Sequence, residues 1–153
     1  MKFSEIISPG QITLDLKATD RWGAIEELVN LLVIQKCIDF GRRDSVIQAV
    51  KSREKTMSTG IGFGIAIPHA STDAIGKVTA AFARSIQGIH FDSLDNQPVK
   101  LVVLFLVPTG QYQQHLKTLA SISRFLNDRE FREQAEQVKT SEELYQLIVK
   151  KKG

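Results

Sequence analysis

Four short segments of the chain have the composition of β-strands. Apolar and polar residues alternate in 12–18 and partly in 78–86, which is the period of a half-buried strand. The segment 65–67, IAI, is short and β-branched at both ends. The segment 100–108, KLVVLFLVP, is apolar at nearly every position, as expected of a strand buried on both faces.

Elsewhere, apolar residues recur at every third or fourth position, which predicts amphipathic helices. Thr19 or Asp20 can cap the first of them, and Thr140-x-x-Glu143 is a capping-box pattern that opens the last. The stripe of the first helix consists of Trp22, Ile25, Leu28, Val29, Leu32 and Val33. Helices are predicted at 20–36, 43–54, 112–126, 128–137 and from 141 onward.

Two segments are rich in turn-forming residues. Three glycines in 58–64, STGIGFG, predict irregular backbone, and Asp92 and Asp95 are turn formers in the connection 91–99. Pro68 ends the preceding short strand because it has no N–H to donate. Strands mixed with helices, including a strand buried on both faces, predict an α/β fold with helices on both faces of the sheet. The length suits one domain, 1–153.

Composition narrows the class of protein. Hydrophobic residues make up 42% of the chain and charged residues 24%, which is typical of a folded protein rather than a disordered one. The net charge is only +3, and the basic groups Arg42–Arg43 and Lys150–Lys152 are not interleaved with aromatic residues. This pattern argues against nucleic-acid binding.

The location of the protein is inferred from three features. Cys37, the single cysteine, cannot form an internal disulfide and has no partner at metal-ligand spacing. The N-terminal segment lacks an apolar signal core, and the apolar run 101–107 is too short to span a bilayer. We therefore expect a cytoplasmic protein without membrane insertion.

The segment GIGFGIAIPHA, 60–70, is the strongest candidate for chemistry. Gly60, Gly62 and Gly64 do not match the dinucleotide fingerprint G-x-G-x-x-G, because position 65 is isoleucine. They do not match a P-loop either, because no Gly-Lys-Ser/Thr follows them. A glycine-rich loop can still present backbone N–H groups to an anion. From spacing alone, a tight turn with positive φ and an anion site both remain open.

The three histidines do not form a metal-binding pattern. His69 follows Pro68 at the end of a predicted strand, where α/β folds place ligands. His115 lies in the first turns of a predicted helix, near the positive end of the helix dipole. His90 has no evident partner, and none of the spacings is typical of zinc. No serine lies in a hydrolase elbow. The residues alone support an α/β domain with a candidate anion site.

A family resemblance adds to this interpretation. The run from Ser58 to His69 closely resembles the active-site motif of the fructose/mannitol class of enzyme IIA domains, in the bacterial phosphoenolpyruvate-dependent phosphotransferase system. Arg53-Glu54, before the motif, fits the same family. The segments that look most like its nitrogen-regulatory branch are DNQPV at 95–99, LVP at 106–108, HLKTL at 115–119 and EELYQ at 142–146. The resemblance covers nearly the whole chain. It implies a mixed, roughly five-stranded sheet between helices.

Carried over residue by residue, the resemblance implies that His69 accepts a phosphoryl group from a histidine phosphocarrier protein. Arg53 and His115 match the two accessory positions that would hold the phosphate oxygens. The implied phosphate loop comprises Ser58, Thr59, Gly60, Gly62, Gly64 and Pro68. No metal or cofactor is implied, because the phosphate arrives activated on another histidine. Phe63 stands where the family commonly has asparagine, and a bulky residue beside the site would affect partner docking rather than chemistry.

Three functions follow from the resemblance. The first is a phosphohistidine regulator whose phosphorylation state changes the target proteins that it binds. The second is a sugar-specific enzyme IIA that passes phosphate to a transporter IIB domain. The third, a binding module that has lost phosphorylation, is disfavoured because Arg53, His69 and His115 are all present.

Overall fold

The computed structural model describes residues 1–151, so Lys152 of the basic tail lies outside the described residues. Within this range, six strands form one mixed sheet in the order β1-β5-β6-β3-β2, with β4 also pairing with β6. The strands are β1 (Ile12–Thr13), β2 (Gly60–Gly62), β3 (Ile65–Ala66), β4 (His69–Thr72), β5 (Thr79–Ile89) and β6 (Val99–Pro108). The expected α/β fold is confirmed, with one strand more than the roughly five expected.

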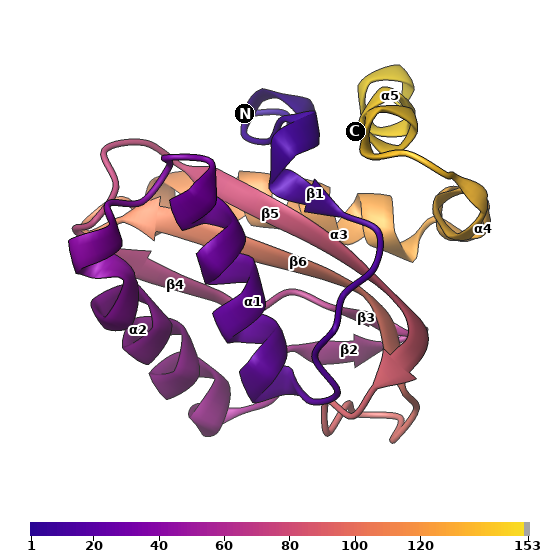
Figure 1. The fold of residues 1–153 in the computed structure, drawn as a ribbon, viewed down its shortest axis with the longest axis horizontal. Helices are drawn as coiled ribbons and strands as arrows, with labels where there is room; N and C mark the ends of the chain where they lie inside the picture. Colours follow the sequence, from indigo (N-terminus) through magenta and orange to yellow (C-terminus); the bar gives the residue numbers. More distant parts are fainter. Residues whose placement is uncertain (152–153) are drawn as a thin grey trace.

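The helices lie on both faces of the sheet, as expected (Figure 1). Helices α1 (Arg21–Ile34) and α2 (Arg43–Thr56) pack on one face. Helices α3 (Leu116–Asn127), α4 (Arg129–Gln137) and α5 (Ser141–Lys150) belong to the core on the other face. Single 3₁₀ turns connect these elements: η1 (Phe3–Glu5), η2 (Pro9–Gln11), η3 (Phe40–Arg42) and η4 (Gln113–His115).

Strand β6 divides the two cores. Leu101, Val103 and Phe105 belong to the cluster under α3 to α5, whereas Val102 and Leu104 belong to the cluster under α1 and α2. Successive side chains of a strand point to opposite faces, so an almost wholly apolar strand contributes to both layers. The predicted doubly buried strand is therefore confirmed.

Helix starts follow the predicted capping chemistry. The Asp20 side chain accepts a hydrogen bond from the Gly23 N–H at 2.9 Å and begins α1. The Thr140 hydroxyl accepts from the Glu143 N–H at 3.1 Å and begins α5. The Glu143 carboxylate accepts from the Lys139 N–H rather than from that of Thr140, so only one half of the predicted capping box forms. Helix α3 begins only at Leu116, four residues later than the predicted start, because the segment before it forms the 3₁₀ turn η4.

Three strand predictions need correction. The predicted strand 12–18 is reduced to β1, because the ladder with β5 covers only Ile12 and Thr13. The stretch 58–64 is not wholly irregular: β2 pairs antiparallel with β3, with a register shift between Gly60 and Gly62. Strand β4 was not predicted, because its polar sequence HAST resembles a loop and only its pairing with β6 makes it a strand.

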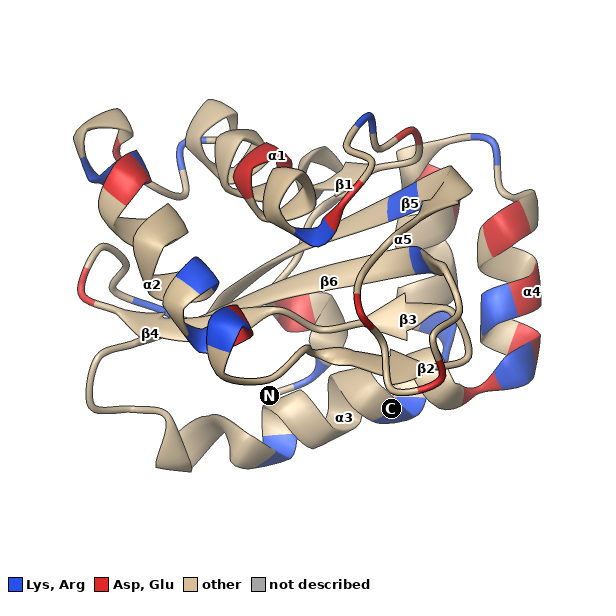
Figure 2. Ribbon diagram, turned by 90° about the horizontal axis from the view of Figure 1, so that it is seen from below, with Lys and Arg blue, Asp and Glu red and all other residues tan. Residues whose placement is uncertain are grey.

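Charged residues of both signs are interspersed on the surface. Figure 2 shows blue and red segments alternating along α4, which carries Arg129, Arg132, Glu130, Glu133 and Glu136. In the described part of the chain, no helix combines the length and apolar character needed to cross a membrane.

The first prediction concerns the core under α3 to α5. Phe82 of β5 is fully buried and contacts the rings of Phe3 and Phe131. Phe82→Ala should lower the free energy of unfolding by about 3–5 kcal/mol, since it leaves a cavity that the surrounding rings cannot fill. Ile86→Ala, on the exposed part of the same strand, is the control and should change stability by less than about 0.5 kcal/mol. Equal losses in urea denaturation would contradict this account of the core.

Candidate active site

His69 begins a strand that Pro68 separates from β3. Ile65 pairs with Leu101 and His69 pairs with Phe105, so β3 and β4 keep the same offset along β6. Pro68 has no N–H for the ladder, but its carbonyl still accepts a hydrogen bond from the Phe105 N–H at 3.0 Å. Pro68 is buried. The backbone before His69 is therefore fixed on the central strand of the sheet.

One nitrogen of the His69 ring is occupied by its own backbone. Nδ1 lies 2.8 Å from the carbonyl oxygen of Ile67. A carbonyl oxygen can only accept a hydrogen bond, so Nδ1 carries the proton of the neutral ring. The lone pair is then on Nε2, which makes Nε2 the nucleophilic nitrogen.

The surroundings of His69 favour the neutral ring. Partial burial lowers the pKa of His69 below its usual 6.5, and the positive charge of Arg53 lowers it further. The hydrogen bond to Ile67 and the carboxylate of Glu54 act in the opposite direction, but the pKa remains lowered. At neutral pH the ring is therefore uncharged and able to attack an electrophile.

His69 lines a cleft of about 340 Å³ together with Arg53. Arg53 lies near the end of α2, and its Nη1 donates a hydrogen bond to the Met57 carbonyl at 2.9 Å. The other lining residues are Ala49, Ala70, Ser71 and Tyr112. A permanent cation and a neutral imidazole in one cleft are suited to a ligand that is both anionic and electrophilic.

Sequence reasoning missed Tyr112. Its ring lies nearly parallel to that of His69, with centroids 6.1 Å apart and an interplanar angle of 12°. Tyr112 comes from the segment before α3, more than forty residues along the chain from His69. No spacing in the sequence links the two residues, because only the folding of β4 beside β6 brings them together.

His115 is close to Tyr112 in the chain but does not line the His69 cleft. It is the N-cap residue of α3, and its N–H donates to the Tyr112 carbonyl at 3.1 Å. Its predicted position near the start of a helix is confirmed. Its contact with phosphate stays a prediction.

Glu54 matches the family at the sequence level but was assigned no role there, and the structure shows that it is structurally important. Its buried carboxylate accepts hydrogen bonds from the Thr59 N–H at 3.0 Å and the Thr59 hydroxyl at 2.6 Å. It also forms a salt bridge with Arg21 at 3.2 Å. A buried carboxylate that is fully bonded in this way fixes the end of α2, and with it Arg53, relative to the segment leading into β2.

The residues of the predicted phosphate loop make mainly structural contacts. The Ser58 hydroxyl donates to the Phe91 carbonyl at 2.6 Å and accepts from the Gly60 N–H at 3.1 Å. A side chain at Gly60 would collide with Ser93. Ser58, Thr59, Gly60, Gly62, Gly64 and Pro68 do not line the His69 cleft. Their contact with phosphate stays a prediction.

Phe63 and Gly64 form the turn between β2 and β3, and both have positive φ, as has Gly62 at the end of β2. The Gly64 carbonyl accepts hydrogen bonds from the N–H groups of Lys100 and Leu101. Leu101 is four residues along β6 from Phe105, the residue that pairs with His69. At roughly 3.3 Å per residue, this places the turn about 13 Å from His69. The expectation that Phe63 lies beside the site is therefore wrong.

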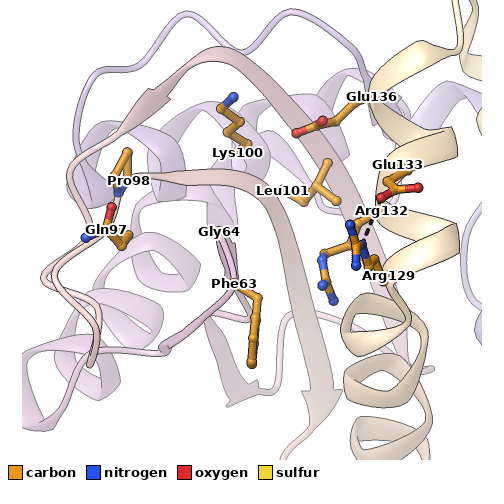
Figure 3. Close-up of a pocket in the computed structure, with 10 residues that line it drawn as sticks. All are labelled: Phe63, Gly64, Gln97, Pro98, Lys100, Leu101, Arg129, Arg132, Glu133 and Glu136. Atoms are coloured by element: carbon orange, nitrogen blue, oxygen red, sulfur yellow. Dashed lines mark hydrogen bonds and ion pairs between the residues drawn. The ribbon is translucent and has the colours of Figure 1, made fainter.

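Phe63 instead lines a separate pocket of about 340 Å³ (Figure 3). Figure 3 shows Phe63 on one side of this pocket and Arg129 and Arg132 on the α4 side. The Arg132 guanidinium lies 5.2 Å from the centre of the Phe63 ring. Phe63 as a whole residue is 71% exposed.

Within residues 1–151, no three His, Cys, Asp or Glu side chains come close enough to hold a metal ion. Cys37 is a free thiol beyond the end of α1. Among the residues singled out from the sequence, Arg53 and His69 are the two that share one cleft.

Residues 5–151 match the model of a known protein family, described as phosphoenolpyruvate-dependent sugar phosphotransferase system, EIIA 2. The chain belongs to this family. The resemblance inferred from the motif around His69 is thus confirmed over nearly the whole chain, and this EIIA chain is a phosphotransfer component of that system.

Relatives of this EIIA chain come from two branches. A fructose-specific EIIA component of Haloferax volcanii is 42% identical over 144 residues, covering 90% of each chain. A nitrogen regulatory protein of Bradyrhizobium diazoefficiens is 32% identical over 150 residues, covering 97% of this chain and 95% of the relative. The crystal structure of nitrogen regulatory protein IIA-Ntr from Neisseria meningitidis superposes with a TM-score of 0.85 at 30% identity, covering 95% and 97%.

The second prediction concerns the charge state of His69. Arg53→Gln should raise the pKa of His69 toward 6.5, because it removes a positive charge that opposes protonation. Titration of the ring by NMR measures this change. Arg129→Gln, an exposed arginine of α4 that does not line the cleft, is the control and should leave the titration unchanged.

The same lowered pKa affects stability. The unfolded chain binds this proton more tightly than the folded chain, so the contribution of neutral His69 is present above pH 6.5 and is lost as pH falls through the folded pKa. His69→Gln should remove this part of the pH dependence. A titration of His69 at or above 6.5 in the wild type would contradict the proposed charge state.

Proposed function

We propose that this EIIA chain accepts a phosphoryl group on Nε2 of His69 from a histidine phosphocarrier protein. The observation that carries the proposal is the hydrogen bond between Nδ1 and the Ile67 carbonyl, which leaves Nε2 with the lone pair. The lowered pKa of the ring and the presence of Arg53 in the same cleft support the assignment.

The reaction is an in-line transfer between two imidazoles. The Nε2 lone pair of His69 forms a bond to phosphorus while the bond from phosphorus to the donor's ring nitrogen breaks, and its electron pair stays on the donor ring. Such transfers depend on positioning and charge stabilisation more than on covalent help from the protein. Arg53 supplies a planar, permanently charged group for the phosphate oxygens. The proton stays on Nδ1 throughout and keeps its hydrogen bond to the Ile67 carbonyl oxygen.

The remaining assigned residues act around this step. We assign His115 as a further hydrogen-bond donor to the phosphate, reached when the donor protein is bound, from its position at the start of α3. Ser58 and Thr59 hold the segment that leads into β2, and Pro68 fixes the backbone of His69. We place this exchange in the cytoplasm, where the partner would be a soluble phosphocarrier.

The phosphorylated chain has two candidate uses. We propose a regulatory use, in which phosphorylation changes the binding of target proteins, supported by the nitrogen regulatory relatives and the 0.85 TM-score of one of them. The 42% identity to a fructose-specific EIIA component favours the alternative, in which phosphate passes to a transporter IIB domain.

The third prediction is that the purified chain becomes phosphorylated when mixed with phosphoenolpyruvate, the first enzyme of the system and the phosphocarrier. His69→Ala should abolish labelling, because it removes the only nucleophile assigned to the cleft. His90→Gln is the matched control, since that ring is 80% exposed and outside the cleft, and should label normally. Wild-type protein that never labels, or His69→Ala protein that labels equally well, would refute the proposed acceptor.

The fourth prediction separates the two uses. The regulatory function predicts that phosphorylated protein keeps its phosphate when mixed with a purified fructose-type IIB domain and fructose. A pull-down comparing wild type with His69→Ala should then recover target proteins that depend on the phosphorylation state. Rapid appearance of phosphorylated sugar would instead establish the transport function.

A further inference from the structure

The ring of Tyr112 lies parallel to the ring of His69 but displaced from it. The interplanar angle of 12° and the centroid separation of 6.1 Å are those of an offset stack. Both side chains line the same cleft and are only partly buried. The contact joins β4 to the segment that precedes α3.

Tyr112 is the one large ring among the neighbours of His69 in this cleft. The other lining residues are two alanines, Ser71 and Arg53. Ser71 is exposed, and the guanidinium of Arg53 attracts water rather than excluding it. Exclusion of water from the histidine ring on the cleft side therefore depends mainly on the tyrosine.

We propose that Tyr112 is a positioning residue of the phosphorylation site, whose ring holds the plane of His69 and shields phosphohistidine from water. The proposal rests on the phosphoryl-acceptor function proposed above. It adds a residue that the family resemblance did not supply and the sequence did not reveal.

A stacked ring is compatible with the reaction because of the direction of attack. The lone pair of Nε2 lies in the plane of the imidazole, so the phosphoryl group approaches along that plane. A ring beside the face of His69 leaves this direction free. It restricts rotation of the imidazole, as does the hydrogen bond from Nδ1 to Ile67, and the two contacts together define the direction in which Nε2 points.

Tyr112 is itself fixed in place. It packs against the hydrophobic cluster under α3 to α5, and its carbonyl accepts the hydrogen bond from the His115 N–H. The contact between Tyr112 and His69 is one between their two rings. The aromatic ring, rather than the hydroxyl, is thus the part assigned to the function.

Three variants test the proposal. Tyr112→Ala removes the ring, and Tyr112→Phe keeps the ring without the hydroxyl. Tyr145→Ala is the matched control, because Tyr145 is the other tyrosine of the chain and packs against the same cluster without lining the cleft. A loss of core packing alone affects both Tyr112→Ala and Tyr145→Ala, whereas a loss of the ring stack on His69 affects only Tyr112→Ala.

Two measurements are made on each variant. NMR titration gives the pKa of His69 without any phosphorylation, while Arg53 and Glu54, the charged groups that act on the ring, stay unchanged. The decay of labelled protein after removal of the phosphocarrier gives the lifetime of phosphohistidine. Tyr112→Ala should raise the pKa of His69 toward its usual value and shorten the lifetime severalfold. Tyr112→Phe and Tyr145→Ala should match the wild type.

The outcomes distinguish this proposal from the acceptor function. Wild-type protein that does not label refutes the acceptor function, whatever the titrations show. Protein that labels, but for which Tyr112→Ala leaves both the pKa and the lifetime unchanged, overturns the role of Tyr112 alone. A Tyr112→Phe variant that loses as much as Tyr112→Ala also overturns it, because the effect would then belong to the hydroxyl.

Discussion

Strand β6 is the element on which the other parts of the structure depend, because it is apolar on both faces and paired along both edges. It pairs antiparallel with β5 on one side and parallel with β3 and β4 on the other. Burying one large apolar side chain contributes about 1.5–3 kcal/mol, and the alternating side chains of β6 contribute to two hydrophobic clusters. Any strand beside β6 therefore has its backbone paired to a strand that is buried on both faces.

The site uses this rigidity at one interruption of the sheet. Pro68 breaks the strand between β3 and β4 without changing the pairing offset, and the next residue is His69. The carbonyl of Ile67, just before the break, accepts the ring N–H of that histidine. Backbone that is fixed by the central sheet thus selects the tautomer of the ring, and the tautomer determines which nitrogen can react.

The charged and the aromatic neighbour of His69 come from elements on opposite sides of the sheet. Arg53 comes from α2, which the buried Glu54 joins to the segment before β2. Tyr112 comes from the segment before α3. The turn that carries Phe63 lies about 13 Å from His69 along β6 and faces a different pocket. The glycine-rich motif therefore spans two separate regions of the surface. The part of the motif that reaches the cleft shared with Arg53 is its end, at His69.

The sequence by itself determined the fold class, the capped start of α5, the doubly buried strand and the family, because these depend on local periodicity, capping side chains and a contiguous motif. It left the cap of α1 open between Thr19 and Asp20, and the structure selects Asp20. It also singled out Arg53 and His69, which the structure brings into one cleft. Only the tertiary structure decided that HAST forms a strand, that Phe63 lies away from His69, that Glu54 bonds to Thr59, and that the ring of Tyr112 stacks beside His69. The physical reason is that these features arise from strand pairing and from contacts between distant segments, and neither leaves a periodic or contiguous pattern in the chain.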